Sequence, residues 1–292
     1  MLTDAFLARL DALRLAVRGA AQGGAGGARR SRALGASAEF SDFREYAPGD
    51  DIRRLDWNAY ARFDRLFLKL FQEEREAAVT VLLDCSGSMA AKWETACKAA
   101  EALSYLALIG GDRARLCFLS EEGPRPAPFF AGRAAYPRFA QALAREAPAG
   151  ALVLAECLKR VEPCPPGLSL LITDGYQEGG LGPALDLLRY RRQECAVVHV
   201  LSPQEMRPQA EGALRLKDAE GGPDLELSAD GPALRAYESA LQDFLRSARG
   251  DCARRGAPYL LLTGDAPFEQ AFPSALAQST LMGVENGKMR GR

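Results

Sequence analysis

The sequence predicts an α/β fold with a doubly wound, mostly parallel sheet of about six strands. Short apolar runs alternate along the chain with longer segments of helical character, which is typical of parallel strands joined by crossover helices. Most of the runs lack polar alternation, so we expect strands that are buried on both faces. The expected strands are residues 79–84, 113–119, 168–174, 195–201 and 258–264, with a short edge strand in the proline-rich segment 121–130.

The segments between these runs predict the helices. Residues 93–109 consist mainly of good helix formers, and Gly110 and Gly111 end the helix. Further helices are expected at residues 134–145, 152–160, 181–193 and 232–249. Residues 213–227 carry EGGPD at their centre and predict an inserted β-hairpin.

Residues 1–38 predict a short helix followed by an arm. Phe6, Leu10, Leu13 and Val17 recur at helical spacing, and we expect this stripe to dock on the core of the protein rather than on a partner. The segment 18–37 is mostly glycine, alanine and arginine, a composition that buries too little apolar surface to fold alone.

Residues 39–76 predict a small β-rich elaboration ahead of an α/β domain at 77–280 and a tail at 281–292. Aromatic and charged residues alternate here, Pro48 and Gly49 fit a type II turn, and the alternation at 66–71 predicts a strand. The segment also contains a charged cluster for which we expect an internal ion-pair lattice, with a docking surface as the alternative. The cluster consists of Asp50, Asp51, Arg53, Arg54 and Asp56.

Composition excludes several classes of protein. The 292 residues carry a formal net charge of −1, which gives no electrostatic basis for binding nucleic acid or an anionic membrane. The seven cysteines are scattered without CxxC spacing, which predicts reduced, mostly core residues. No apolar run is long enough to span a membrane, and charged residues stand where a signal peptide would be apolar. We therefore expect a cytoplasmic protein.

The loop after the first expected strand of the domain is the candidate site. Asp84, Ser86 and Ser88 follow one another at i, i+2 and i+4, with Gly87 allowing the turn, so their oxygens can converge on a hard cation such as Mg²⁺ or Mn²⁺. Capping of the following helix explains the same spacing equally well. Asp174 ends another expected strand, and the carboxyl ends of parallel strands meet in one crevice, which favours the metal site. His199, inside a strand, predicts a core residue.

Two motifs carry a family resemblance. The sequence DCSGS at 84–88 resembles the DxSxS of the metal-ion-dependent adhesion site (MIDAS) in von Willebrand factor A domains, and TDG at 173–175 resembles that site's distal aspartate motif. The stretch EFSDFREYAPGDDIRRLDWNAYARFDRLFLKLFQEERE closely resembles the signature of the bacterial DUF58 proteins. The resemblance implies a Rossmann-like, von Willebrand A-type sheet. It also implies metal ligands at Asp84, Ser86, Ser88 and Asp174.

One departure weakens the implied metal site. Where the family usually has a threonine ligand before a helix, this chain has Gly150-Ala151-Leu152, and a leucine side chain cannot coordinate a cation. We therefore expect Mg²⁺ or Mn²⁺ to bind weakly, or the loop to work without metal.

The resemblance also implies a partner, because DUF58 proteins are typically encoded with MoxR-type AAA+ ATPases. It predicts a non-catalytic adaptor in the chaperone-like maturation of other protein complexes, with a client protein as a further partner. The expected contact is Asp84, Ser86, Gly87, Ser88 and Asp174, with the donors of Ser86, Gly87 and Ser88 facing outward. The alternative is a Mg²⁺-dependent phosphohydrolase with Asp84 as nucleophile, although no second aspartate follows at position 86.

Overall fold

The chain divides into two compact units, residues 21–76 and the remainder, and each is described by itself. A computed structural model describes residues 1–11, 38–48, 50, 52, 55–73, 77–177, 179–208, 212–216, 219–221, 224–279 and 281. Among these residues, no helix is both long and apolar enough to cross a membrane.

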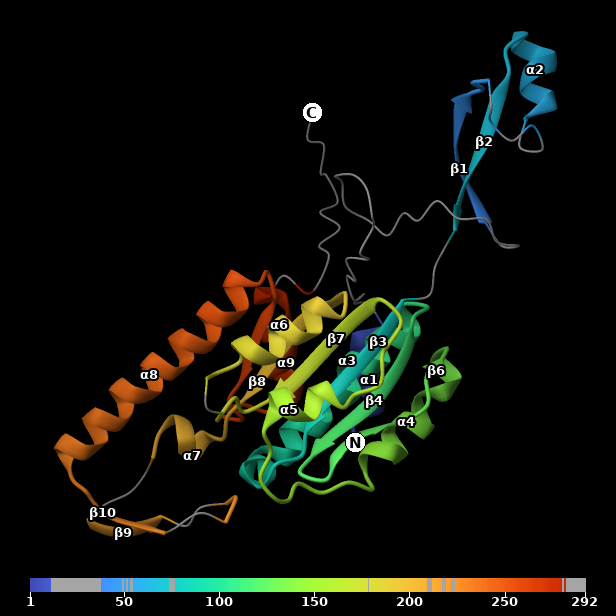
Figure 1. The fold of residues 1–292 in the computed structure, drawn as a ribbon. Helices are drawn as coiled ribbons and strands as arrows, with labels where there is room; N and C mark the ends of the chain where they lie inside the picture. Colours follow the sequence, from blue (N-terminus) through green and yellow to red (C-terminus); the bar gives the residue numbers. More distant parts are fainter. Residues whose placement is uncertain are drawn as a thin grey trace, which may run out of the picture. The chain divides into compact units, whose positions relative to one another are not determined.

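The larger unit is built on a mostly parallel sheet (Figure 1), as predicted. Its strands follow the spatial order β11-β8-β7-β3-β4-β5, and β6 also pairs with β4. The strands are β3 (Ala78–Asp84), β4 (Arg113–Ser120), β5 (Gly123–Pro126), β6 (Phe130–Ala131), β7 (Gly167–Thr173), β8 (Gln193–Val200) and β11 (Tyr259–Leu262). The pairs from β11 to β4 are parallel, whereas β5 and β6 lie antiparallel to β4. The chain reverses direction across the sheet between β3 and β7, which is the switch point of a doubly wound fold.

Helices cover both faces of this sheet because its strands are apolar on both sides. One face packs against α1 (Asp4–Leu10), α3 (Trp93–Ile109), α4 (Tyr136–Leu143) and α9 (Phe268–Gln278). The other face packs against α5 (Leu154–Lys159), α6 (Gly182–Tyr190) and α8 (Gly231–Arg254). Figure 1 shows α5 and α6 in front of the sheet, with α3 behind it.

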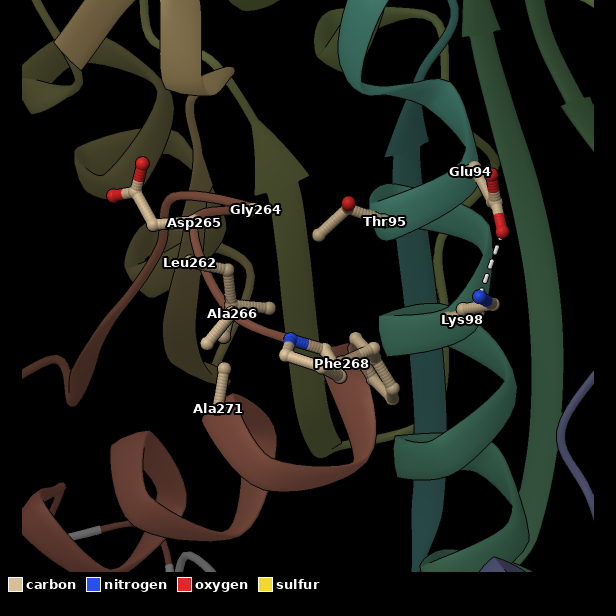
Figure 2. Close-up of a pocket in the computed structure, with 10 residues that line it drawn as sticks. Glu94, Thr95, Lys98, Leu262, Gly264, Asp265, Ala266, Phe268 and Ala271 are labelled. Carbon is tan, nitrogen blue, oxygen red and sulfur yellow. Dashed lines mark hydrogen bonds and ion pairs between the residues drawn. The ribbon is translucent and has the colours of Figure 1, made fainter. Parts of the chain in front are cut away.

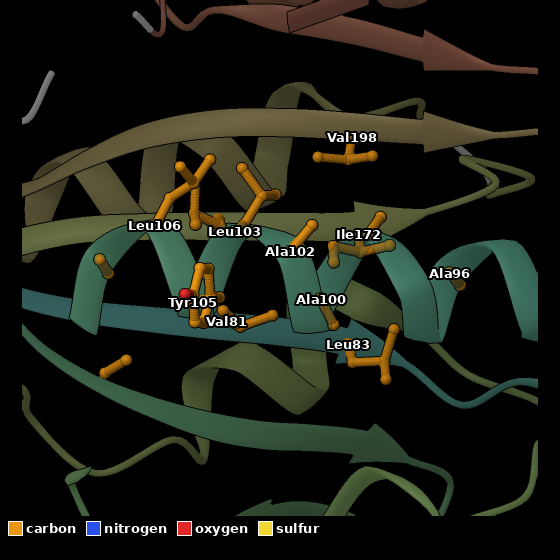
Figure 3. Packing of buried hydrophobic residues seen from close by; sticks show 14 of the residues in the cluster. Val81, Leu83, Ala96, Ala100, Ala102, Leu103, Tyr105, Leu106, Ile172 and Val198 are labelled. Carbon is orange, nitrogen blue, oxygen red and sulfur yellow. The ribbon is translucent and has the colours of Figure 1, made fainter. Parts of the chain in front are cut away.

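The main core cluster lies between α3 and the sheet (Figure 3). Successive residues of β3 alternate between the two clusters, because Val81 and Leu83 belong to this one and Leu82 to the other. Phe6 and Leu10 of α1 are buried in the main cluster, so the N-terminal helix docks on the protein's own core, as predicted. Leu13 and Val17 lie outside the described residues.

The larger unit also contains the predicted hairpin, formed by β9 (Gly212–Leu216) paired antiparallel with β10 (Leu225–Ala229). The short helix α7 (Pro203–Met206) and the helix α9 were not predicted. All seven cysteines lie in the described part of the chain, form no disulfide there, and five of them are buried.

The smaller unit contains an antiparallel pair, β1 (Ala38–Glu45) with β2 (Phe67–Glu73), in agreement with the predicted β-rich elaboration. It also contains an unpredicted helix, α2 (Trp57–Phe63), which begins where the Asp56 side chain accepts from the Asn58 and Ala59 amides. The predicted turn includes Gly49 and the predicted ion-pair lattice includes Asp51, Arg53 and Arg54, all of which lie outside the described residues.

Candidate functional site

The predicted site lies at the carboxyl ends of β3 and β7, the two strands that flank the switch point. Asp84 is the last residue of β3, and Asp174 directly follows β7. Both side chains are almost completely buried. The fold therefore brings the two carboxylates to the same edge of the sheet, as the strand-end argument predicts.

The Asp84 carboxylate is fully engaged by neutral donors. Oδ1 accepts from the Ser86 amide at 2.9 Å and from the Ser86 hydroxyl at 2.7 Å, while Oδ2 accepts from the Thr173 hydroxyl at 2.6 Å. Burial, with a contribution from the nearby charge of Asp174, nevertheless raises the pKa of Asp84 to about 6. No sequence argument singled out Thr173 as a partner of Asp84, since its role depends on the neighbouring strand.

The loop that follows β3 is held in place by its own backbone. The Gly87 amide donates to the Gly150 carbonyl oxygen at 2.8 Å, and the Ala149 amide donates to the Cys85 carbonyl oxygen at 2.8 Å. The expectation that Ser86 and Gly87 present free donors is therefore wrong, because the Gly87 amide is bonded within the fold and Ser86 is buried. Ser88 is partly exposed, and its hydroxyl lies 3.0 Å from that of Ser86.

The tip of the hairpin approaches this loop. A methyl group added at Gly87 would lie 2.4 Å from the carbonyl oxygen of Ala219, which follows β9. A real Cβ does not come so close to a backbone oxygen, so glycine is required here for the hairpin to pack as it does.

Asp174 is paired with a buried lysine that sequence reasoning missed. Its Oδ1 accepts from the Tyr176 amide at 3.2 Å, and its Oδ2 lies 2.9 Å from Lys92 Nζ. The second contact is an ion pair rather than an aligned hydrogen bond. Lys92 is the last residue of the 3₁₀ helix Gly87–Lys92 and reaches Glu205 of α7 as well.

His199 lies beside this network as a satisfied core residue. The backbone oxygen of Asp174 can only accept, so His199 Nε2 donates to it at 2.7 Å, and Nδ1 accepts from the Tyr259 hydroxyl at 2.6 Å. Burial lowers the pKa of His199 to about 4, which keeps the ring neutral. A neutral ring with both nitrogens engaged is not available as a general base or a metal ligand.

Two features of the side chains disfavour tight binding of a divalent metal ion. Leu152 is only 8% exposed and packs in the core cluster with Leu154 and Cys157, so an apolar side chain lies at the position that the resemblance matches to the family's usual threonine ligand. Asp174 already faces an ammonium group, and few carboxylates are left for a hard cation. The weakened Mg²⁺ or Mn²⁺ site stays a prediction.

A pocket lies at the same edge of the sheet, near β11. The pocket of about 280 Å³ is formed by the first turns of α3 and by the segment between β11 and α9 (Figure 2). Its charged groups include Glu94 and Lys98, which pair at 2.7 Å across one turn of α3. A surface pair of this kind indicates no particular chemistry.

Residues 42–244 match the family model described as "Protein of unknown function DUF58", which is more than half of the chain. The chain belongs to the DUF58 family. The DUF58 resemblance is thus confirmed, and the strand order with an antiparallel edge strand is that of the predicted Rossmann-like, von Willebrand A-type sheet.

Relatives and solved structures add the following likenesses. Two uncharacterized proteins, Mb1516 of Mycobacterium bovis and Rv1480 of Mycobacterium tuberculosis, are each 31% identical over 254 residues, covering 79% of this chain and 76% of the relative. The conserved hypothetical protein BatB from Bacteroides thetaiotaomicron is 14% identical, with a TM-score of 0.42 over 69% of this chain and 97% of BatB. The SpRpn10 VWA domain is 15% identical, with a TM-score of 0.39 over 72% of this chain and 99% of that domain.

Proposed function

We propose that this DUF58 protein is a non-catalytic, protein-binding adaptor that works in the cytoplasm with a MoxR-type AAA+ ATPase. Its task in this proposal is the chaperone-like maturation of other protein complexes. The family resemblance supports the choice of ATPase, and the surface around the candidate site supports the mode of action.

Exposed apolar residues lie in the loop after β3 and in the segment that its backbone contacts, and this observation carries the proposal. We call this set the apolar rim and define it as Ala90, Ala91, Ala149, Ala151 and Val153, all of which are exposed. Val153, which precedes α5, is 66% exposed. Clustered exposed apolar residues favour a contact with another protein. Because Ser86 and the Gly87 amide are engaged within the fold, the rim is a better candidate for the contact than the loop's polar groups.

The chemistry of the crevice does not favour the hydrolase alternative. A nucleophilic carboxylate must reach its substrate, whereas Asp84 is 1% exposed and accepts hydrogen bonds on both oxygens. The neighbouring Cys85 is also a poor nucleophile, because burial raises the pKa of its thiol to about 12.

Co-purification with the MoxR-type ATPase of the same organism, in the presence of Mg²⁺ and ATP, tests the proposal. Val153→Arg places a charge in the apolar rim and should weaken capture about tenfold or more. Tyr190→Arg is the matched control, since Tyr190 is 86% exposed at the end of α6, close to the amino end of β8.

Equal capture of wild type and Val153→Arg would reject the apolar rim as the contact. A Mg²⁺-dependent phosphatase activity of the wild type that disappears in Asp84→Asn would instead favour the hydrolase.

A further inference from the structure

Lys92 is buried in a set of groups that all favour a positive charge. Its side chain is 1% exposed, and its Nζ lies 2.9 Å from Asp174 Oδ2 and 2.5 Å from Glu205 Oε1. The Tyr176 ring lies below the ammonium group, with its centroid 4.9 Å from Nζ. An aromatic face stabilises a desolvated cation, so the site combines two carboxylates with a π surface.

The second carboxylate belongs to a helix cap. Glu205 Oε2 accepts from the Ser202 amide at 2.6 Å, and the Glu205 amide donates to the Ser202 hydroxyl at 3.2 Å. The two residues therefore form a capping box at the start of α7, immediately after β8. The Tyr237 hydroxyl of α8 donates to the Glu205 carbonyl oxygen at 2.7 Å, which fixes the same turn from the other side.

The Lys92 ammonium consequently connects three loops at the carboxyl edge of the sheet. Lys92 itself ends the loop after β3, Asp174 begins the loop after β7, and Glu205 lies in the helix after β8. Holding several strand ends together through oxygen atoms is the structural task that a bound cation performs in such a crevice.

A divalent ion at Asp174 is incompatible with this arrangement. Lys92 would have to leave its buried position, or two cations would have to share one carboxylate at short range in a poorly solvated site. We propose that Lys92 is the resident cation of this crevice and holds Asp174 and Glu205 in place of a divalent metal ion. This inference rests on the function proposed above, and it implies that this chain needs no metal ion to bind its partner.

Metal titration of the wild-type chain tests the proposal without any variant. Calorimetry with Mg²⁺ and with Mn²⁺ should show no saturable binding up to about 1 mM. The thermal midpoint should be the same with either metal and with a chelator. Saturable binding in the micromolar range that is lost in Asp174→Asn would overturn the proposal.

Substitution of the lysine gives a second test with a matched control. Lys92→Met keeps the length of the side chain but leaves two carboxylates without their cation. The midpoint of thermal unfolding should therefore fall by roughly 10 °C. Lys98→Met removes a partly exposed lysine from α3, the helix that follows Lys92, and should shift the midpoint by less than about 2 °C. If the two variants have the same midpoint of thermal unfolding, the proposal is overturned.

The outcomes separate this inference from the proposed function. A chain that binds metal tightly and still captures the ATPase would overturn the role of Lys92 alone. A chain that binds no metal and captures no ATPase would support the role of Lys92 and overturn the proposed function.

Discussion

His199 is neutral in the folded protein because burial holds its pKa at about 4, below its usual value of 6.5. The unfolded chain therefore takes up this proton first as the pH falls, so the stabilisation is complete above pH 6.5 and is lost toward pH 4. The expected loss between about pH 7 and about pH 5 is about 2 kcal/mol. Urea unfolding of wild type and His199→Phe at both pH values measures it. The stability difference between the two proteins should change by that amount, and a constant difference would contradict the assignment.

Asp84 titrates over the same range in the opposite sense. Burial raises its pKa from 3.8 to about 6, so its ionisation reduces stability as the pH rises through that value. Asp84→Asn removes this ionisation, and its stability relative to wild type should improve by about 1 kcal/mol between ~pH 5 and ~pH 8. Urea unfolding with Asp243→Asn as an exposed control measures the change. A variant that becomes relatively less stable at the higher pH would indicate a cation bound at Asp84.

At the scale of elements, helix α2 depends on its N-cap. Asp56 accepts from the Asn58 and Ala59 amides, so Asp56→Ala should destabilise the helix by about 1 kcal/mol, whereas Asp56→Asn keeps an acceptor. Hydrogen exchange of the amides in Trp57–Phe63 reports this directly. Unchanged exchange in the alanine variant would show that the helix is held by other contacts.

The hairpin depends on Gly87 because Ala219 packs against that backbone. Gly87→Ala should displace the hairpin tip and speed hydrogen exchange or proteolysis around residues 212–229, while the sheet stays protected. Ser88→Ala in the same loop is the control, since it adds no atom near Ala219. Identical exchange in the two variants would mean that the hairpin does not rest on the loop.

Whether an element could be predicted from the sequence depends on which interactions stabilise it. Strands such as β3 and β7 are buried on both faces, so their burial leaves continuous apolar runs that the sequence displays. Helix α2 was missed because its cap and its left-handed end at Asp64 leave weak local signals in an aromatic segment. Helix α9 was missed as well, and it carries Pro273 in its interior.

The residues of the candidate site also differ in whether local sequence could predict them. Asp84, Ser86 and Ser88 lie within one loop, and the strand-end rule adds Asp174. Lys92 and Glu205 are 113 residues apart, and the sequence around neither residue indicates that they pair. The burial of Ser86 and the bond from Gly87 to Gly150 also depend on how distant segments pack, so the accessibility of the loop was predicted wrongly.

At the scale of the whole molecule, one edge of the larger unit combines the features described above. The carboxyl ends of β3, β7 and β8 carry the buried Lys92 network, and the apolar rim lies in the loop after β3 and in the segment that its backbone contacts. Buried polar groups held by ion pairs and hydrogen bonds, at the same edge as exposed apolar residues, suit a preformed docking site in which little ordering is needed on binding.

Hydrogen exchange of the chain with and without the MoxR-type ATPase tests whether the apolar rim is the docking surface. We expect complex formation to slow exchange in residues 85–92 and 147–153, which carry the apolar rim, and to leave the amino edge near Tyr190 unchanged. Protection confined to the amino edge, or to residues 38–73, with none at the rim, would contradict it.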